Sequence, residues 1–157
     1  TIRGVLPELL KNFQVIHLCG KGKLDPHLTD VQGYVQFEYI KDELRDLFAL
    51  ADIVISRAGA NAICELLALH KPNILIPLSA KASRGDQILN AESFENQGYS
   101  YVLQEKDVTS ETLLNAVNSV YEDRDKYIEA MHHSKLANPI ETIVNLANQL
   151  ASRKKKR

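Results

Sequence analysis

The feature that most constrains the fold is a strand, turn, helix and strand pattern over residues 52–90. Residues 53–55 form a short, β-branched apolar run, which is typical of a strand covered on both faces. Small residues at 56–60 interrupt this run, and apolar residues then recur at helical spacing until Pro72 ends the helix. A second apolar run at 74–76 predicts the next strand. The whole pattern predicts a βαβ unit.

The turn in this unit has the properties of an anion-binding site. Its small residues leave backbone N–H groups free at the start of the helix, where the helix dipole also favours negative charge. Glu65 lies near the helix start in line with Asn61, and its carboxylate can accept hydrogen bonds from both hydroxyls of a ribose. A phosphate at the turn and a ribose at Glu65 together indicate a nucleotide. The competing interpretation is that Glu65 is an ordinary solvated helix residue.

Strands and helices alternate along the rest of the chain. The alternation predicts an α/β fold of the Rossmann-like kind, with a mostly parallel sheet flanked by helices. Strands are expected over residues 15–18, 34–37 and 101–103, and helices over 5–13, 42–51, 87–96, 110–121, 126–135 and 139–152. Ligands of such sheets bind at the carboxyl ends of the strands, where Tyr39 and Ile40, residues 57–65 and residues 86–90 all fall.

Several helix ends carry local signals. Asp86 and Thr109 are expected to cap the helices that follow them, and Gly98 is expected to end the helix at 87–96. His70 is expected to satisfy carbonyl groups at the end of its own helix. The two histidines at 132–133 are expected on the surface rather than on a metal ion.

Two further motifs have ordinary explanations. The segment at 20–22 has neither a GK[ST] sequence nor a clear helix after it, so a plain loop is favoured over a phosphate-binding loop. Cys19 and Cys64 lack the spacing of metal ligands and are expected to be reduced core residues of a cytosolic protein.

Length and charge limit the class of protein. At 157 residues the chain is expected to form one domain, and no apolar run is long enough to span a bilayer. Five of the 19 basic residues form a tail at 153–157, so the rest of the chain has six more acidic than basic residues. An acidic body argues against nucleic-acid binding, whereas the tail fits either an anionic membrane surface or a solvated end.

Two segments, SRAGANAICELLAL at 56–69 and RGDQILNA at 84–91, resemble the MurG family. Its members are inverting, metal-independent glycosyltransferases of the GT-B fold, which transfer N-acetylglucosamine from UDP-GlcNAc to lipid I in peptidoglycan synthesis. The resemblance covers essentially the whole chain and implies that residues 1–152 form the C-terminal, UDP-sugar-binding half, followed by a basic tail at 153–157. It implies no metal, no cofactor and a peripheral position on the cytoplasmic face of the bacterial cell membrane.

The resemblance also implies what this chain lacks. The first strand and the glycine-rich loop of the family would precede residue 1, which would leave the sheet one edge strand short and prone to associate. The N-terminal domain, which binds lipid I and is expected to supply the general base, would be a separate part of the protein. No catalytic residue is therefore assigned to this chain, and the chain alone is expected to be inactive.

The family motif assigns donor-binding roles to ten residues of this chain. The expected contacts are Tyr39 and Ile40 with uracil, Glu65 with ribose, Arg57, Gly59, Ala60 and Asn61 with the diphosphate, and Asp86, Gln87 and Asn90 with the sugar and phosphates. Two positions depart from the family, because Ala58 stands where many members carry serine and Asp86 replaces a glutamine.

Structural interpretations stay open for three of these residues. Arg57 could form an ion pair with Asp52 or Glu65, Asn90 could only brace its helix, and Tyr39 could be a core residue.

Two other functions are compatible with the same pattern. The first is the donor-binding module of another UDP-sugar transferase, or a related epimerase, although the sequence offers no acid/base set for an epimerase. The second is a non-catalytic nucleotide-binding subunit that recruits a membrane partner.

Overall fold

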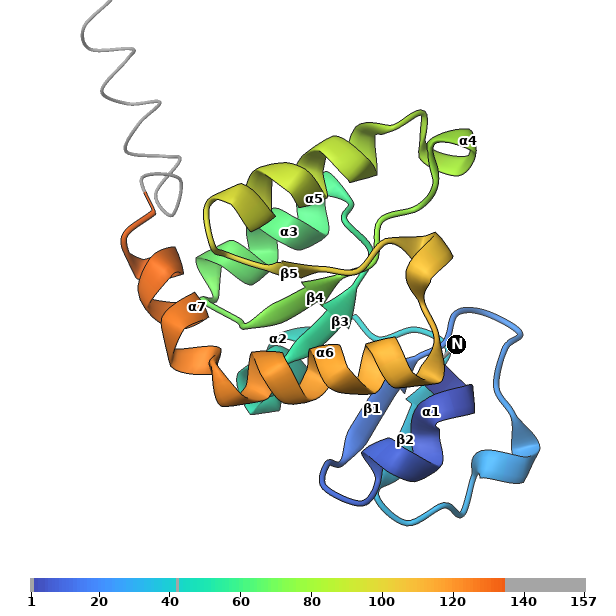
Figure 1. Cartoon of the computed structure of the whole chain (residues 1–157). Helices are drawn as coiled ribbons and strands as arrows, with labels where there is room; N and C mark the ends of the chain where they lie inside the picture. Colours follow the sequence, from blue (N-terminus) through green and yellow to red (C-terminus); the bar gives the residue numbers. More distant parts are fainter. Residues whose placement is uncertain (1, 42, 135–157) are drawn as a thin grey trace, which may run out of the picture.

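The structure is a computed structural model, and it describes residues 2–41 and 43–134. Short strands alternate with helices, and every strand pair is parallel, which confirms the predicted α/β class (Figure 1). The strands are β1 (Val15–Leu18), β2 (Tyr34–Phe37), β3 (Val54–Ser56), β4 (Asn73–Leu75) and β5 (Tyr101–Val102). The helices are α1 (Ile2–Leu9), α2 (Leu44–Leu50), α3 (Ala60–Ala68), α4 (Ala80–Ser83), α5 (Asp86–Asn96), α6 (Ser110–Glu122) and α7 (Arg124–His132), with 3₁₀ turns η1 (Pro26–Leu28) and η2 (Glu105–Asp107).

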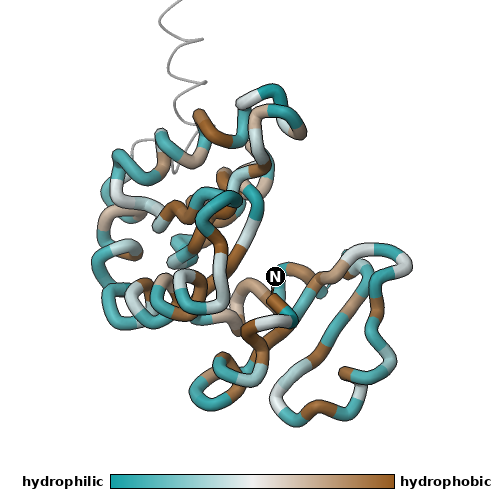
Figure 2. Tube along the Cα trace, turned by 45° about the vertical axis from the view of Figure 1, so that its right-hand side comes forward, coloured by the Kyte–Doolittle hydropathy of each residue, from teal (hydrophilic) through white to brown (hydrophobic). Residues whose placement is uncertain are grey.

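Helices cover both faces of the sheet formed by β3, β4 and β5. Successive residues of a strand point to opposite faces, so Ile74 and Leu75 of β4 enter different clusters. Ile74 packs with apolar residues of α1 and α6, whereas Leu75 packs with those of α3, α5 and α7. Figure 1 shows the same layers, with α6 on one side of the strands and α3 and α5 on the other. Figure 2 shows apolar stretches alternating with polar ones along the chain.

The described strands pair as two sheets, whereas the sequence pattern predicts one. β1 pairs with β2, and β3, β4 and β5 pair in that order. On β1 the N–H groups of Val15 and Cys19 donate to β2 and its neighbouring residues, so the backbone groups of Ile16 lie on the opposite edge. Within the described residues no backbone hydrogen bond joins β1 to β3. The discontinuity thus lies between β1 and β3, not at an outer edge.

Helix α1 connects the two sheets by packing. Its residues Val5 and Leu9 belong to one apolar cluster, against which Val15 of β1 and Ile55 of β3 both pack. The same cluster contains the buried face of α6, with which α1 is in contact. The position of β1 relative to β3 therefore depends on side-chain packing rather than on a continuous hydrogen-bond ladder.

Of three helix starts, two differ from the prediction and one agrees with it. α1 begins and ends several residues earlier than expected and contains Pro7 in its interior. Asp86 was expected as a helix cap, but this prediction is wrong because α5 already begins at Asp86 and Gly85, with a φ of 88°, is its N-cap. Thr109 does cap α6, since its hydroxyl accepts a hydrogen bond from the Thr112 N–H and the Thr112 hydroxyl accepts one from the Thr109 N–H.

The bounds of the segment after β4 and of α7 also differ from the predicted ones. The segment expected as a loop after β4 contains the short helix α4. The helix expected at 126–135 is α7, which ends at His132. The helix expected at 139–152 and the tail at 153–157 lie outside the described residues.

Two helices end in the same hydrogen-bonding motif. After α5, Gly98 has a φ of 73° and the Tyr99 N–H donates to the Phe94 carbonyl at 2.9 Å, which confirms the predicted stop. After α3 the equivalent left-handed position is His70, with a φ of 49°. Its backbone rather than its ring satisfies a carbonyl, and the ring stacks on that of His132 at 3.9 Å between centroids. The ends of α3 and α7 are thereby in contact.

Candidate functional site

The start of α3 offers free backbone donors beside open space. Gly59 is its N-cap with no side-chain hydrogen bond, and the first amide to bond within the helix is that of Ile63, at 3.1 Å from the Gly59 carbonyl. The N–H groups of the three preceding residues, 60–62, thus have no partner within the helix. A methyl group added at Gly59 would have no other atom within 4 Å. This geometry suits an anion, as the sequence predicts.

Helix α5 holds the two loops that border this position. The Asn90 amide donates from Nδ2 to the carbonyl of Ala58 at 3.0 Å, directly before the start of α3. The Gln87 side chain accepts at Oε1 from the N–H of Leu78, at 3.0 Å, in the segment after β4. Asn90 therefore braces the turn after β3 and not merely its own helix. Through α5 the structure thus links Asn90 to the turn at Gly59 and Gln87 to the segment after β4.

Arg57 lies at the carboxyl end of β3 and has two partners. Its Nη1 is 2.8 Å from Oε1 of Glu105 and donates to the carbonyl of Ile76 at 3.1 Å. The ion pairs with Asp52 or Glu65 that were considered for Arg57 are therefore not formed. Glu105 is not predicted by any sequence motif, and its only signal is that it follows β5 as Arg57 follows β3.

Glu65, Asn61 and Asp86 are exposed. No hydrogen bond or ion pair of their side chains occurs within the described part of the chain. Glu65 and Asn61 lie on α3, one turn apart, as expected. The interpretation of Glu65 as a solvated residue and its predicted role on a ribose both remain compatible with this position.

Tyr39 and Ile40 follow β2, at the carboxyl end of the other sheet. The Tyr39 side chain is 72% exposed, so its interpretation as a core residue is wrong. The ammonium group of Lys41 lies 5.9 Å from the Tyr39 ring centroid. Between these two residues and the turn at Gly59, the described residues show no hydrogen bond or ion pair. No polar contact among the described residues therefore links Tyr39 and Ile40 to the rest of the candidate site.

The remaining sequence motifs have structural explanations. The segment at 20–22 is a loop, and the Gly22 N–H donates to Oε1 of Glu38 at 2.5 Å. Both cysteines are free, but Cys64 is exposed, so its prediction as a core residue is wrong. Across residues 2–41 and 43–134 no group of three or more His, Cys, Asp or Glu side chains is arranged to hold a metal ion. The helices in the same ranges include none that is long and apolar enough to cross a membrane.

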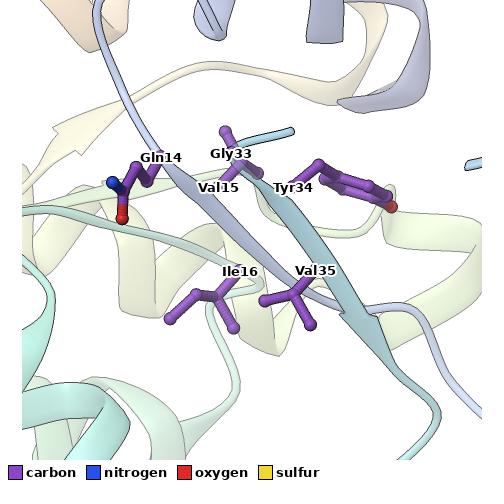
Figure 3. A pocket seen from close by; sticks show the side chains of 6 residues that line it. All are labelled: Gln14, Val15, Ile16, Gly33, Tyr34 and Val35. Carbon is purple, nitrogen blue, oxygen red and sulfur yellow. The ribbon is translucent and has the colours of Figure 1, made fainter. Parts of the chain in front are cut away.

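A hollow of about 290 Å³ lies against β1 and β2 and contains none of the predicted site residues. Ile16 and Val35 lie side by side there (Figure 3). With Leu18 and Phe37 they form one apolar face of the two-stranded sheet, each side chain being 37–46% exposed. This face and the polar groups around Gly59 are separate features.

Comparisons with known proteins agree with these observations. Residues 1–150 match the family described as "Glycosyltransferase family 28 C-terminal domain". A UDP-N-acetylglucosamine–N-acetylmuramyl-(pentapeptide) pyrophosphoryl-undecaprenol N-acetylglucosamine transferase of Lachnoclostridium phytofermentans is 65% identical over 149 residues, which are 95% of this chain and 42% of the relative. The transferase of the same name from Lachnospira eligens is 64% identical over 145 residues, covering 92% and 41%. The chain thus spans less than half the length of these relatives.

Solved structures show the same fold. The crystal structure of Acinetobacter baumannii MurG superimposes with a TM-score of 0.72 at 21% identity, covering 94% of this chain and 48% of that one. A glycotransferase of kitacinnamycin superimposes with a TM-score of 0.64 at 19% identity, covering 92% and 38%.

Proposed function

The chain belongs to the glycosyltransferase family 28 C-terminal domains, and from this we propose that it binds UDP-GlcNAc as the donor half of an N-acetylglucosaminyltransferase acting on lipid I in peptidoglycan synthesis. The observation that carries the proposal is the family match over residues 1–150, together with relatives of that activity at 64–65% identity. We further propose that the donor domain comprises residues 1–152 and that residues 153–157 are a basic tail.

In the proposed complex the diphosphate lies at the start of α3. The free N–H groups that follow Gly59 and the positive end of the helix dipole bind its oxygens. Arg57 adds positive charge from the end of β3. Asn90 supports this arrangement, because its hydrogen bond to the Ala58 carbonyl fixes the turn that presents the N–H groups.

The other predicted residues surround the two ends of the donor. Glu65 accepts hydrogen bonds from the ribose hydroxyls, and Tyr39 and Ile40 bind the uracil. The polar start of α5, with Asp86 and Gln87, contacts the sugar and the phosphates. For Tyr39 and Ile40 this requires that the end of β2 and the turn after β3 face one ligand, although no hydrogen bond joins them among the described residues.

The chemistry proposed for the whole protein is a single displacement at the anomeric carbon. A base outside this chain deprotonates the acceptor hydroxyl, and UDP leaves with its developing charge held by the N–H groups of α3 and by Arg57. Fixed donors of this kind contribute about 3 kcal/mol each to a transition state. We propose that they replace a metal ion, that no cofactor is required, and that the protein acts peripherally at the cytoplasmic face of the bacterial membrane.

The test is a titration of the ¹⁵N-labelled chain with UDP-GlcNAc, UDP and ADP, followed by heteronuclear NMR. Uridine nucleotides are expected to shift the amide signals of Ile40, Gln87 and residues 59–65, whereas ADP leaves them unchanged. A further shift near Asn90 with UDP-GlcNAc alone would locate the sugar. If a well-folded sample responds to none of the ligands, the same titration on a longer protein with the acceptor domain decides, and silence there refutes the proposal.

A further inference from the structure

Glu105 joins three segments that border the proposed diphosphate position. One carboxylate oxygen, Oε1, forms an ion pair with Nη1 of Arg57 at 2.8 Å, after β3. The other, Oε2, accepts from the backbone N–H of Ser79 at 3.2 Å, after β4. Glu105 itself follows β5, in the turn η2. A single side chain thus spans the carboxyl ends of all three strands of this sheet.

The Arg57–Glu105 ion pair is too exposed to contribute much to the stability of the fold. The side chains of Arg57 and Glu105 are 49% and 38% exposed, and pairs of this kind are worth about 0–1 kcal/mol. The geometry is nevertheless specific, because Nη1 of Arg57 also donates to the carbonyl of Ile76 at 3.1 Å. The hydrogen bond and the ion pair at the same nitrogen together restrict the direction of the guanidinium group. The pair therefore orients Arg57 more than it stabilises the protein.

The same arrangement leaves part of Arg57 available. Its Nε and Nη2 have no hydrogen-bond partner among residues 2–41 and 43–134. A guanidinium group presents donors in a fixed fork that suits phosphate oxygens. An acceptor on Nη1 holds one side of this fork, and the other nitrogens can still donate to an anion.

We propose that Glu105 is a positioning residue for the donor diphosphate. It holds Arg57 beside the start of α3 and, through Ser79, fixes the segment that leads to α5. This inference rests on the proposed function, because it assigns Glu105 to the same donor site. Glu105 does not contact the donor in this scheme and acts through Arg57.

If Glu105 instead competed with the diphosphate for Arg57, its removal would change UDP affinity in the opposite direction. A carboxylate near a diphosphate repels it, so a residue that merely competes for Arg57 would weaken UDP binding, and its removal would tighten it. If positioning dominates, Glu105→Ala weakens UDP binding. Glu105→Gln keeps an oxygen acceptor for Arg57 and removes the charge, so it restores most of the affinity.

The test is a double-mutant cycle on the dissociation constant of UDP, measured by calorimetry at fixed ionic strength. Glu105→Ala is expected to weaken binding about tenfold, Glu105→Gln at most about threefold, and Glu105→Ala in an Arg57→Ala background is expected to have no further effect. Glu8→Ala is the matched control, because it breaks the exposed Lys11–Glu8 pair far from the site. It should leave UDP binding unchanged. Thermal unfolding of each variant verifies that the fold is retained.

Each outcome decides between the two proposals. If the wild-type chain and the longer protein both fail to bind UDP, the proposed function is refuted and the role of Glu105 with it. If UDP binds and Glu105→Ala binds as tightly as wild type or more tightly, only the positioning role is refuted. The positioning role is also refuted if Glu105→Ala weakens binding equally with and without Arg57.

Discussion

Replacing Gly59 by alanine separates binding from stability at the start of α3. The backbone there has a φ of −68° and a ψ of 142°, which any residue adopts, and no atom beyond Gly59 and its two chain neighbours lies within 4 Å of the added methyl group. The fold therefore gives no reason for glycine at this position. The open space is explained if a ligand approaches the backbone closely, as the proposed diphosphate does.

The expected effect on stability is close to zero. Alanine lowers the entropy of the unfolded chain, which stabilises by about 0.4–1 kcal/mol at a compatible position. Alanine is also a poorer N-cap than glycine, which costs on the order of 0.5–1 kcal/mol. The two contributions offset each other, so the free energy of unfolding of Gly59→Ala should stay within about 0.5 kcal/mol of wild type.

The expected effect on binding is large. The methyl group would stand where a phosphate oxygen meets the N–H groups at the start of α3, and one lost hydrogen bond to a charged group costs about 1.5–3 kcal/mol. This corresponds to a UDP dissociation constant about 10–150-fold higher, measurable by calorimetry beside urea unfolding. Gly4→Ala is the control: it lies within α1, where the methyl group would be 4.0 Å from Ser110 Oγ, and should stabilise the fold without affecting UDP. Unchanged UDP binding by Gly59→Ala would refute a diphosphate at α3.

Two further predictions concern helix ends. Thr109→Ala removes the hydroxyl that accepts from the Thr112 N–H and should lower the free energy of unfolding by about 1 kcal/mol, measured by urea denaturation, with Ser110→Ala as the adjacent control. Burial and the neighbouring His132 lower the pKa of His70 from its ordinary 6.5, so the unfolded chain binds this proton more tightly than the fold does. The contribution of neutral His70 to the free energy of unfolding is complete above about pH 6.5 and is lost as the pH falls below this value. Urea denaturation from pH 8 to 5 should show this loss, and His70→Gly should reduce it; an unchanged slope would contradict the reasoning.

Local sequence signals predicted the part of the site that lies within one βαβ unit. β3, β4 and the start of α3 lie within one residue of their expected positions, because apolar runs and the break at 56–60 depend only on neighbouring residues, whereas α3 ends at Ala68, before Pro72 is reached. The same holds for Thr109 and Gly98, whose roles follow from the chain on either side. The prediction of Asp86 as an N-cap was wrong because the left-handed Gly85 allows α5 to begin one residue earlier.

The contacts that hold the site together could not be predicted in this way. Asp52 and Glu65 were considered as partners of Arg57 because they are near it in sequence. The actual partner, Glu105, is selected by the strand order β3, β4, β5, which brings distant loops to one edge. The brace from Asn90 to the Ala58 carbonyl likewise depends on how α5 packs beside α3.

The separation of the two sheets has a consequence for local opening of the fold. A two-stranded sheet is marginal by itself, so β1 and β2 depend on α1 for their attachment to the larger sheet. Regions held by packing alone open at lower free energy than a continuous ladder, and their amide protons exchange with solvent sooner. The amide of Ile16, on the edge away from β2, then exchanges rapidly, whereas that of Ile76, bonded to the Ser56 carbonyl at 2.8 Å, is protected. Any strand that pairs along this edge of β1 would turn two cooperative units into one.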